Sequence, residues 1–178
     1  MIALIVVDMI KGNLPFFNED QLAIIPRIKR VAEEVRRSGN LVVYANDSYT
    51  EKDWLFRFMK RHAIRGTNEV EVLDELKPES GDIVLEKKRF SAFFRTDLDL
   101  ILREYGVEKV AIAGVNTHVC VLATALDAVS NNFEAVILKD CCASNKRELH
   151  EFVVNKYKLI GLDVKTSEEF LREISEGF

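Results

Sequence analysis

Short apolar runs alternate with longer amphipathic segments along the chain, and this alternation limits the possible folds more than any other feature. The runs are nearly continuous in Val, Ile and Leu, which is typical of parallel strands that helices cover on both faces. They span residues 2–7, 41–45, 83–85, 110–113, 135–138 and 162–164. Strands that alternate with helices through short connections predict an α/β fold with a doubly wound, mainly parallel six-stranded sheet.

The segments between these runs include four with the apolar spacing of helices, namely residues 21–37, 96–104, 117–131 and 145–158. In the first, Ile24, Ile28 and Val31 recur on one face, and Gly39 follows as a stop signal. Thr96 is a suitable N-cap for the second.

The stretch from residue 48 to residue 77 is the longest interruption of this pattern. It is rich in aromatic and charged residues, and we expect short helices and loops that form one wall of a site. No linker rich in Pro or Gly divides the 178 residues, and a chain of this length can bury a substantial core. We therefore expect a single domain over residues 1–178.

The composition argues against several classes of partner. The formal net charge is -4, whereas a surface that follows phosphates normally carries a basic excess, so we expect no nucleic acid. No apolar stretch approaches the ~20 residues that cross a bilayer, so we expect no membrane association. Cys120, Cys141 and Cys142 are an odd number with an adjacent pair, which is a poor disulfide framework and favours a reducing cytoplasm.

Ligands of doubly wound sheets bind beyond the carboxyl ends of the strands, so polar residues directly after the apolar runs are the candidates for function. They are Asp8, Asn46, Asp47, Lys87, the segment 114–120 and Asp140. Asp8 is either a base whose pKa burial raises, or a cap of the following turn. Asp140 is expected to order the strand ends through hydrogen bonds.

Cys120 and Lys87 each have a chemical and a structural interpretation. A Cys in the first turn of a helix meets unpaired N–H groups and the positive end of the dipole, which lower a thiol pKa. The alternative is a small core residue. Lys87 would hold a thiolate and a carboxylate together, or it belongs to a solvated charge run over residues 86–89.

Three blocks of sequence together resemble the isochorismatase-like cysteine hydrolases, a family that includes nicotinamidases and N-carbamoylsarcosine amidohydrolases. The blocks are LIVVDM, EKKRFSAFFRTDLDLIL and IAGVNTHVCVLATALDA, and the likeness runs from about residue 2 to residue 140. The resemblance implies strand order 3-2-1-4-5-6 and a catalytic trio of Asp8, Lys87 and Cys120. It also implies a cis peptide between Val115 and Asn116, and a homo-oligomer (dimer or tetramer).

The resemblance further implies a mechanism in which backbone N–H groups of Asn116 and Cys120 hold an oxyanion. The metal-binding nicotinamidases of the family use an Asp-x-His pair after the second strand, but Tyr49 stands where that His would be. Asp47 and His62 remain as metal candidates, and two ligands make a poor zinc site. We therefore expect no metal, and the chemistry needs no organic cofactor.

The sequence thus predicts an enzyme that hydrolyses an amide or ureido C–N bond of a small molecule through a thioester. Nicotinamidase and isochorismatase activities on the same fold stay open, as does a catalytically silent, flavodoxin-like binding protein. A receiver-type signalling domain would need an acidic pair after the first strand, which this chain lacks. Side chains expected to line the substrate pocket are Tyr49, Trp54, Phe90 and His118, with Phe58 and Phe93 as further candidates.

Overall fold

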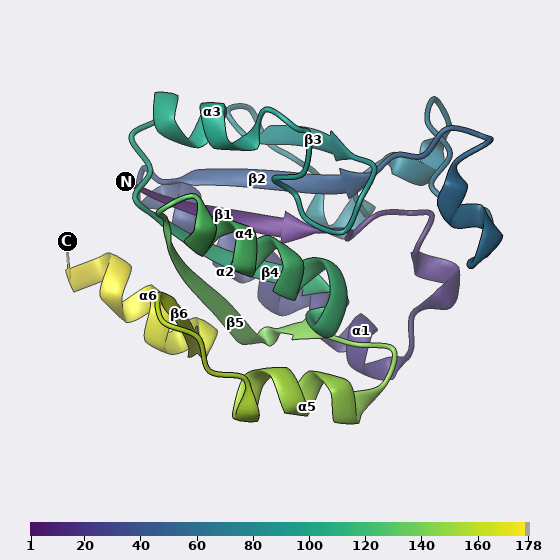
Figure 1. The fold of residues 1–178 in the computed structure, drawn as a ribbon. Coiled ribbons are helices and arrows are strands. Elements are labelled where there is room, and N and C mark those ends of the chain that lie inside the picture. Colours follow the sequence, from purple (N-terminus) through teal and green to yellow (C-terminus); the bar gives the residue numbers. More distant parts are fainter. Residues whose placement is uncertain (177–178) are drawn as a thin grey trace.

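A computed structural model describes residues 1–176, which fold around one six-stranded sheet with helices on both faces (Figure 1). The strands are β1 Ile2–Val7, β2 Leu41–Asp47, β3 Ile83–Lys87, β4 Lys109–Val115, β5 Glu134–Ala143 and β6 Leu162–Lys165. They lie in the order β3-β2-β1-β4-β5-β6, and each neighbouring pair is parallel. This confirms the predicted fold class and strand order.

The helices are α1 Glu19–Ala23, α2 Ile25–Arg37, α3 Leu98–Glu104, α4 Leu122–Ser130, α5 Arg147–Lys156 and α6 Ser167–Glu176. One apolar core layer lies between the sheet and α2 with α6, and contains Ile28 and Phe170. The other lies between the sheet and α3 with α4, and contains Leu98 and Ala125. None of the helices in the described range is long and apolar enough to cross a membrane.

Two helices differ from their predictions at their first turns. The segment 21–37 is divided at Ile24, because Pro26 lacks an N–H group and suits only the beginning of a helix, here α2. The segment 117–131 begins as a π-helical turn, η5 Thr117–Val121, before α4.

Helix α6 was not predicted, although its apolar residues recur at helical spacing. Its first residue is fixed by Asp140, whose carboxylate accepts hydrogen bonds from the Ser167 N–H (2.7 Å) and hydroxyl (2.6 Å). The expectation that Asp140 orders the strand ends agrees with this contact.

The stretch between β2 and β3 folds as loops with three short helical turns, as predicted. Its first part lies beyond the arrowhead of β2 in Figure 1, and the chain then returns along the sheet to the start of the parallel strand β3. The turns are η2 Trp54–Arg57, η3 Asn68–Val70 and η4 Asp74–Leu76, and a further turn, η1 Leu14–Phe16, follows β1. A small apolar cluster that includes Ile10, Tyr49 and Leu55 anchors this stretch at the carboxyl edge of the sheet.

Gly114 lets β1 and β4 approach closely where both strands reach this edge. It pairs with Val7, and the register of β4 against β5 shifts at this point. Its φ is 115°, and a Cβ placed there would lie 2.1 Å from the Val7 carbonyl oxygen. Only glycine fits this backbone, and the Val115–Asn116 peptide that follows is cis, as the resemblance implied.

We expect Gly114→Ala to lower the free energy of unfolding by more than about 3 kcal/mol, because a strained backbone (~1–3 kcal/mol) adds to a clash with the main chain of β1. Gly39→Ala is the matched control. Gly39 also has a positive φ (72°) but has nothing within 4 Å of the new methyl group, so its cost should be about 1–2 kcal/mol. Denaturant unfolding of the two variants tests this, and equal losses would contradict the close approach.

Candidate active site

The carboxyl ends of three strands of the sheet bring Asp8, Lys87 and Cys120 together. Asp8 follows β1, Lys87 ends β3, and Cys120 lies in η5 directly after β4. The Lys87 Nζ lies 3.0 Å from Asp8 Oδ2 and 3.7 Å from Cys120 Sγ. All three residues are buried, with exposed fractions of 2%, 1% and 8%. The geometry fits one proton-exchanging unit and excludes the interpretation of Lys87 as part of a solvated charge run.

Asp47 is a fourth member of this cluster; the sequence had suggested it as a polar residue at a strand end and as a metal candidate, but not as part of the trio. It ends β2, between the strands that carry Asp8 and Lys87. Its Oδ1 accepts a hydrogen bond from Lys87 Nζ at 2.5 Å, and its backbone N–H donates to Asp8 Oδ1 at 2.9 Å. The Lys87 ammonium also donates to the Arg89 carbonyl at 3.0 Å.

The main chain holds Asp8 in a conformation that turns its carboxylate into the site. Its φ is 55°, in the left-handed region that Asp tolerates better than most residues. The Asp8 N–H donates to the Ala45 carbonyl at 3.0 Å, and the Asn13 side chain donates to the Asp8 carbonyl at 3.0 Å. Both ends of the residue are therefore fixed.

Burial sets the ionisation of the Asp8 carboxyl. Removal from water raises its pKa, and the nearby charge of Asp47 raises it further, while Lys87 opposes both; the result is a pKa of about 7. Burial alone would lower the pKa of Lys87, but the carboxylates of Asp47 and Asp8 raise it well above its usual value. Lys87 therefore stays charged, whereas Asp8 can gain or lose a proton near neutral pH.

The pKa of the Cys120 thiol is raised, whereas the sequence led us to expect a lowered pKa. Burial raises its pKa well above the usual value, with Asp8 adding to the rise and Lys87 opposing it. Loss of water disfavours the charged thiolate and is the largest cause of the rise. The resting thiol is thus protonated, and it needs a base in contact; its Sγ lies within 4.8 Å of a carboxylate oxygen of Asp8.

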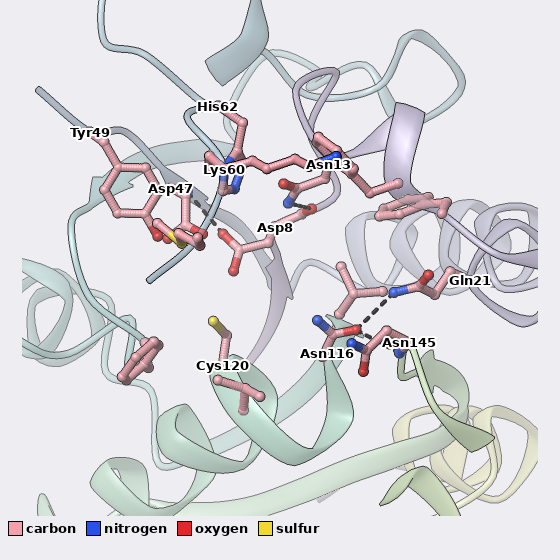
Figure 2. A pocket seen from close by; sticks show the side chains of 16 residues that line it. Asp8, Asn13, Gln21, Asp47, Tyr49, Lys60, His62, Asn116, Cys120 and Asn145 are labelled. Carbon is pink, nitrogen blue, oxygen red and sulfur yellow. Dashed lines mark hydrogen bonds between the residues drawn. The ribbon is translucent and has the colours of Figure 1, made fainter. Parts of the chain in front are cut away.

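A cavity of about 420 Å³ opens over Asp8 and Cys120 (Figure 2). Figure 2 shows Tyr49, Lys60 and His62 on one side of these two residues. Asn116, Gln21 and Asn145 lie on the other side. Residues of the lining that were not candidates from the sequence are Asn13, Phe16, Phe17, Gln21, Met59, Lys60 and Asn145.

Of the side chains expected in the pocket wall, Tyr49 and Phe90 line the cavity, whereas Trp54 and His118 lie outside its lining. Trp54 is mostly exposed, and its ring packs edge-on against Phe58. His118 lies in the π-helical turn η5, and its Nδ1 lies 3.0 Å from Ser144 Oγ. Phe58 and Phe93 are likewise outside the lining.

Asn116 is fixed on the cavity wall by both its side chain and its carbonyl. Its Oδ1 accepts hydrogen bonds from Gln21 Nε2 (2.8 Å) and from the Asn145 N–H (3.0 Å). Its carbonyl accepts from the N–H groups of Val119 and Val121, the two neighbours of Cys120. The backbone around the thiol is therefore rigid. An oxyanion hole made by Asn116 and Cys120 N–H groups stays a prediction.

The described residues do not fit a resident metal ion. Their single group of three potential ligands joins Asp8, Asp47 and Cys120, and the Lys87 ammonium already lies among these ligand atoms. His62 is not part of that group; its Nδ1 lies 2.8 Å from the Lys60 carbonyl. The Lys87 ammonium supplies the positive charge that a metal would bring.

Solved structures share this fold, and known proteins share about a third of the aligned residues. The Isochorismatase domain family matches residues 2–169. The chain is 35% identical to the N-carbamoylsarcosine amidase of Thermoplasma acidophilum, with a TM-score of 0.85 and coverage of 94% of this chain and 96% of that chain. It is 31% identical to the pyrazinamidase of Pyrococcus horikoshii, solved in complex with zinc, with a TM-score of 0.85 and coverage of 93% and 98%. It is 32% identical to the ureidoacrylate amidohydrolase of Serratia proteamaculans, over 78% of this chain and 68% of that protein.

We expect the purified protein to hold less than stoichiometric zinc, because an ammonium group occupies the centre of the ligand cluster. Lys87→Met should bind zinc more tightly, since it removes the ammonium and leaves three potential ligand atoms within 4.8 Å of one another. Elemental analysis after dialysis against zinc compares the two proteins. One tightly held equivalent in the unsubstituted protein would contradict this assignment.

Proposed function

Because the chain belongs to the isochorismatase family, we propose that it is a hydrolase that cleaves a C–N bond of a small amide or ureido compound through a thioester on Cys120. The contact of one buried ammonium with a carboxylate and a thiol at the floor of a cavity carries this proposal. The names of the amidase and amidohydrolase relatives support the choice of bond.

The first half of the reaction transfers the acyl group to sulfur. Asp8 takes the proton of the Cys120 thiol, and the Lys87 ammonium stabilises the thiolate. The sulfur forms a bond to the carbonyl carbon, and the π electrons move to the oxygen, which backbone N–H groups of Asn116 and Cys120 hold. When the C–N bond breaks, protonated Asp8 returns its proton to the leaving nitrogen.

The second half releases the acid. Asp8, again ionised, takes a proton from a water molecule, and the hydroxide attacks the thioester carbon. The C–S bond breaks, and the proton on Asp8 returns to the Cys120 sulfur. The sum is amide plus water to acid plus amine or ammonia. An acid with a pKa near 7 suits both the acceptance and the return of a proton at neutral pH.

Cys120→Ala, Asp8→Asn and Lys87→Ala should each lower the turnover of small amides by about three orders of magnitude, and combinations should add little, because the three groups act as one unit. Cys141→Ala is the matched control, since Cys141 is a buried thiol outside the cavity. Ammonia release from a panel of amide and ureido compounds measures this.

Near-normal turnover of Cys120→Ala would direct attention to a reaction that needs no thiol, such as isochorismate cleavage. Absence of turnover in every assay, together with an unreactive Cys120, would indicate the silent binding protein.

The pH dependence of kcat/KM should show an acid limb with a midpoint near pH 7, because Asp8 must be ionised to take the thiol proton. Below this midpoint kcat/KM should fall about tenfold per pH unit, as expected for a single proton. The midpoint of this acid limb should be the same for substrates with different leaving groups. A midpoint near 4, the usual value of an exposed carboxyl, would contradict a base whose pKa burial raises to about 7.

A further inference from the structure

We propose that Asp47 is a positioning residue: it holds the Lys87 ammonium, so that Asp8 remains available to exchange a proton with Cys120. One test of this inference measures amide hydrolysis and rests on the proposed function. The other measures the alkylation of Cys120 and does not. The inference replaces the role of metal ligand that the sequence left open for Asp47.

The Lys87 ammonium lies closer to the carboxylate of Asp47 than to that of Asp8. Lys87 Nζ lies 2.5 Å from Asp47 Oδ1 but 3.0 Å from Asp8 Oδ2. Short N–H···O contacts between charged groups are the strong ones. Without Asp47, Lys87 would form its ion pair with Asp8 alone, and an Asp in a one-to-one buried pair is a weak base.

The sheet itself fixes this arrangement. Asp47 and Lys87 are directly paired positions of β2 and β3, so their side chains leave the sheet at the same edge. The backbone N–H of Asp47 donates to Asp8 Oδ1, and this bond does not depend on the Asp47 side chain. Replacement of the carboxylate by an amide therefore changes the charge while the main-chain link remains.

Lys87 is the positive group that contacts both carboxylates, those of Asp8 and Asp47. The titratable groups that face them are Lys87, Cys120 and Tyr49, with Lys60 and His62 on the cavity wall. The Arg89 guanidinium is directed to Asp53 instead, and only its carbonyl contacts Lys87. Two buried carboxylates thus share one ammonium in contact with them, and loss of one carboxylate changes the ionisation of the other.

The charge count shows what Asp47 contributes during the reaction. Before proton transfer the site holds two carboxylates, one ammonium and one thiol. After transfer it holds one carboxylate, one carboxylic acid, one ammonium and one thiolate. The net charge is the same, and Asp47 is the anion that stays on Lys87 throughout. Lys87, whose Nζ lies 3.7 Å from the Cys120 sulfur, is thus held by a carboxylate that does not itself react.

The kinetic test compares Asp47→Asn with Asp47→Glu and Asp82→Asn. In Asp47→Asn the acid limb of kcat/KM should move to lower pH by about one to three units, because Lys87 then acts on Asp8 alone. Asp47→Glu keeps the charge and should keep the limb near its original place. Asp82→Asn removes another buried carboxylate, one paired with Arg36 far from the site, and should leave the limb unchanged.

The chemical test needs no amide substrate. The rate at which iodoacetamide alkylates Cys120 is followed against pH by mass spectrometry of the peptide that contains it. Asp47 helps to raise the pKa of the Cys120 thiol, so Asp47→Asn should shift alkylation to lower pH. This shift is expected even if no amide is hydrolysed, which separates failure of this inference from failure of the proposed function.

An alkylation profile and an acid limb that both stay in place in folded Asp47→Asn would overturn the inference. A shift of the same size in Asp47→Glu would also overturn it, because shape and not charge would then be responsible. If Asp47→Asn does not fold, as judged by thermal unfolding, Asp47→Ser removes the same charge and takes its place in both measurements.

Discussion

The site depends on the contacts of one buried ammonium group, that of Lys87. An unpaired charge in a protein interior is very costly, so Lys87 can be buried only because two carboxylates and a carbonyl contact it. The same ammonium lies beside the Cys120 sulfur, and it offsets the negative charge that appears there when the thiol loses its proton. The groups that make the burial of Lys87 possible are therefore also the groups that exchange protons.

The sheet order brings these groups together from distant parts of the chain. Strands β3, β2, β1 and β4 are consecutive neighbours, and each delivers one member of the cluster at its carboxyl end or just beyond it. Gly114 permits the close approach of β4 to β1, and Asn116 then fixes the turn that carries Cys120. A fold of parallel strands thus places four side chains within contact distance without a dedicated binding loop.

The sequence predicted the fold and the proximity of Asp8, Lys87 and Cys120 on different grounds, and the catalytic role of the three residues stays a prediction. Continuous Val, Ile and Leu runs identify strands covered on both faces, whereas the trio came from motifs that contain Asp8, Lys87 and Cys120. Asp47 was assigned no place in the trio because its contact with Lys87 depends on strand register, which a single sequence does not show. The raised pKa of Cys120 depends on burial, and the place of His118 depends on its contact with Ser144; neither is visible in residue spacing.

The account requires that Asp8 be a carboxyl group that titrates near neutral pH inside the folded protein. Infrared difference spectroscopy of the unsubstituted protein against Asp8→Asn, recorded between pH 5 and pH 9, measures this directly. We predict a protonated carboxyl band that is present at low pH, disappears with a midpoint near pH 7 and is missing from the variant. An Asp8 that is fully ionised at pH 5 would contradict the account, because Lys87 would then hold Asp8 as a fixed anion with no proton to exchange.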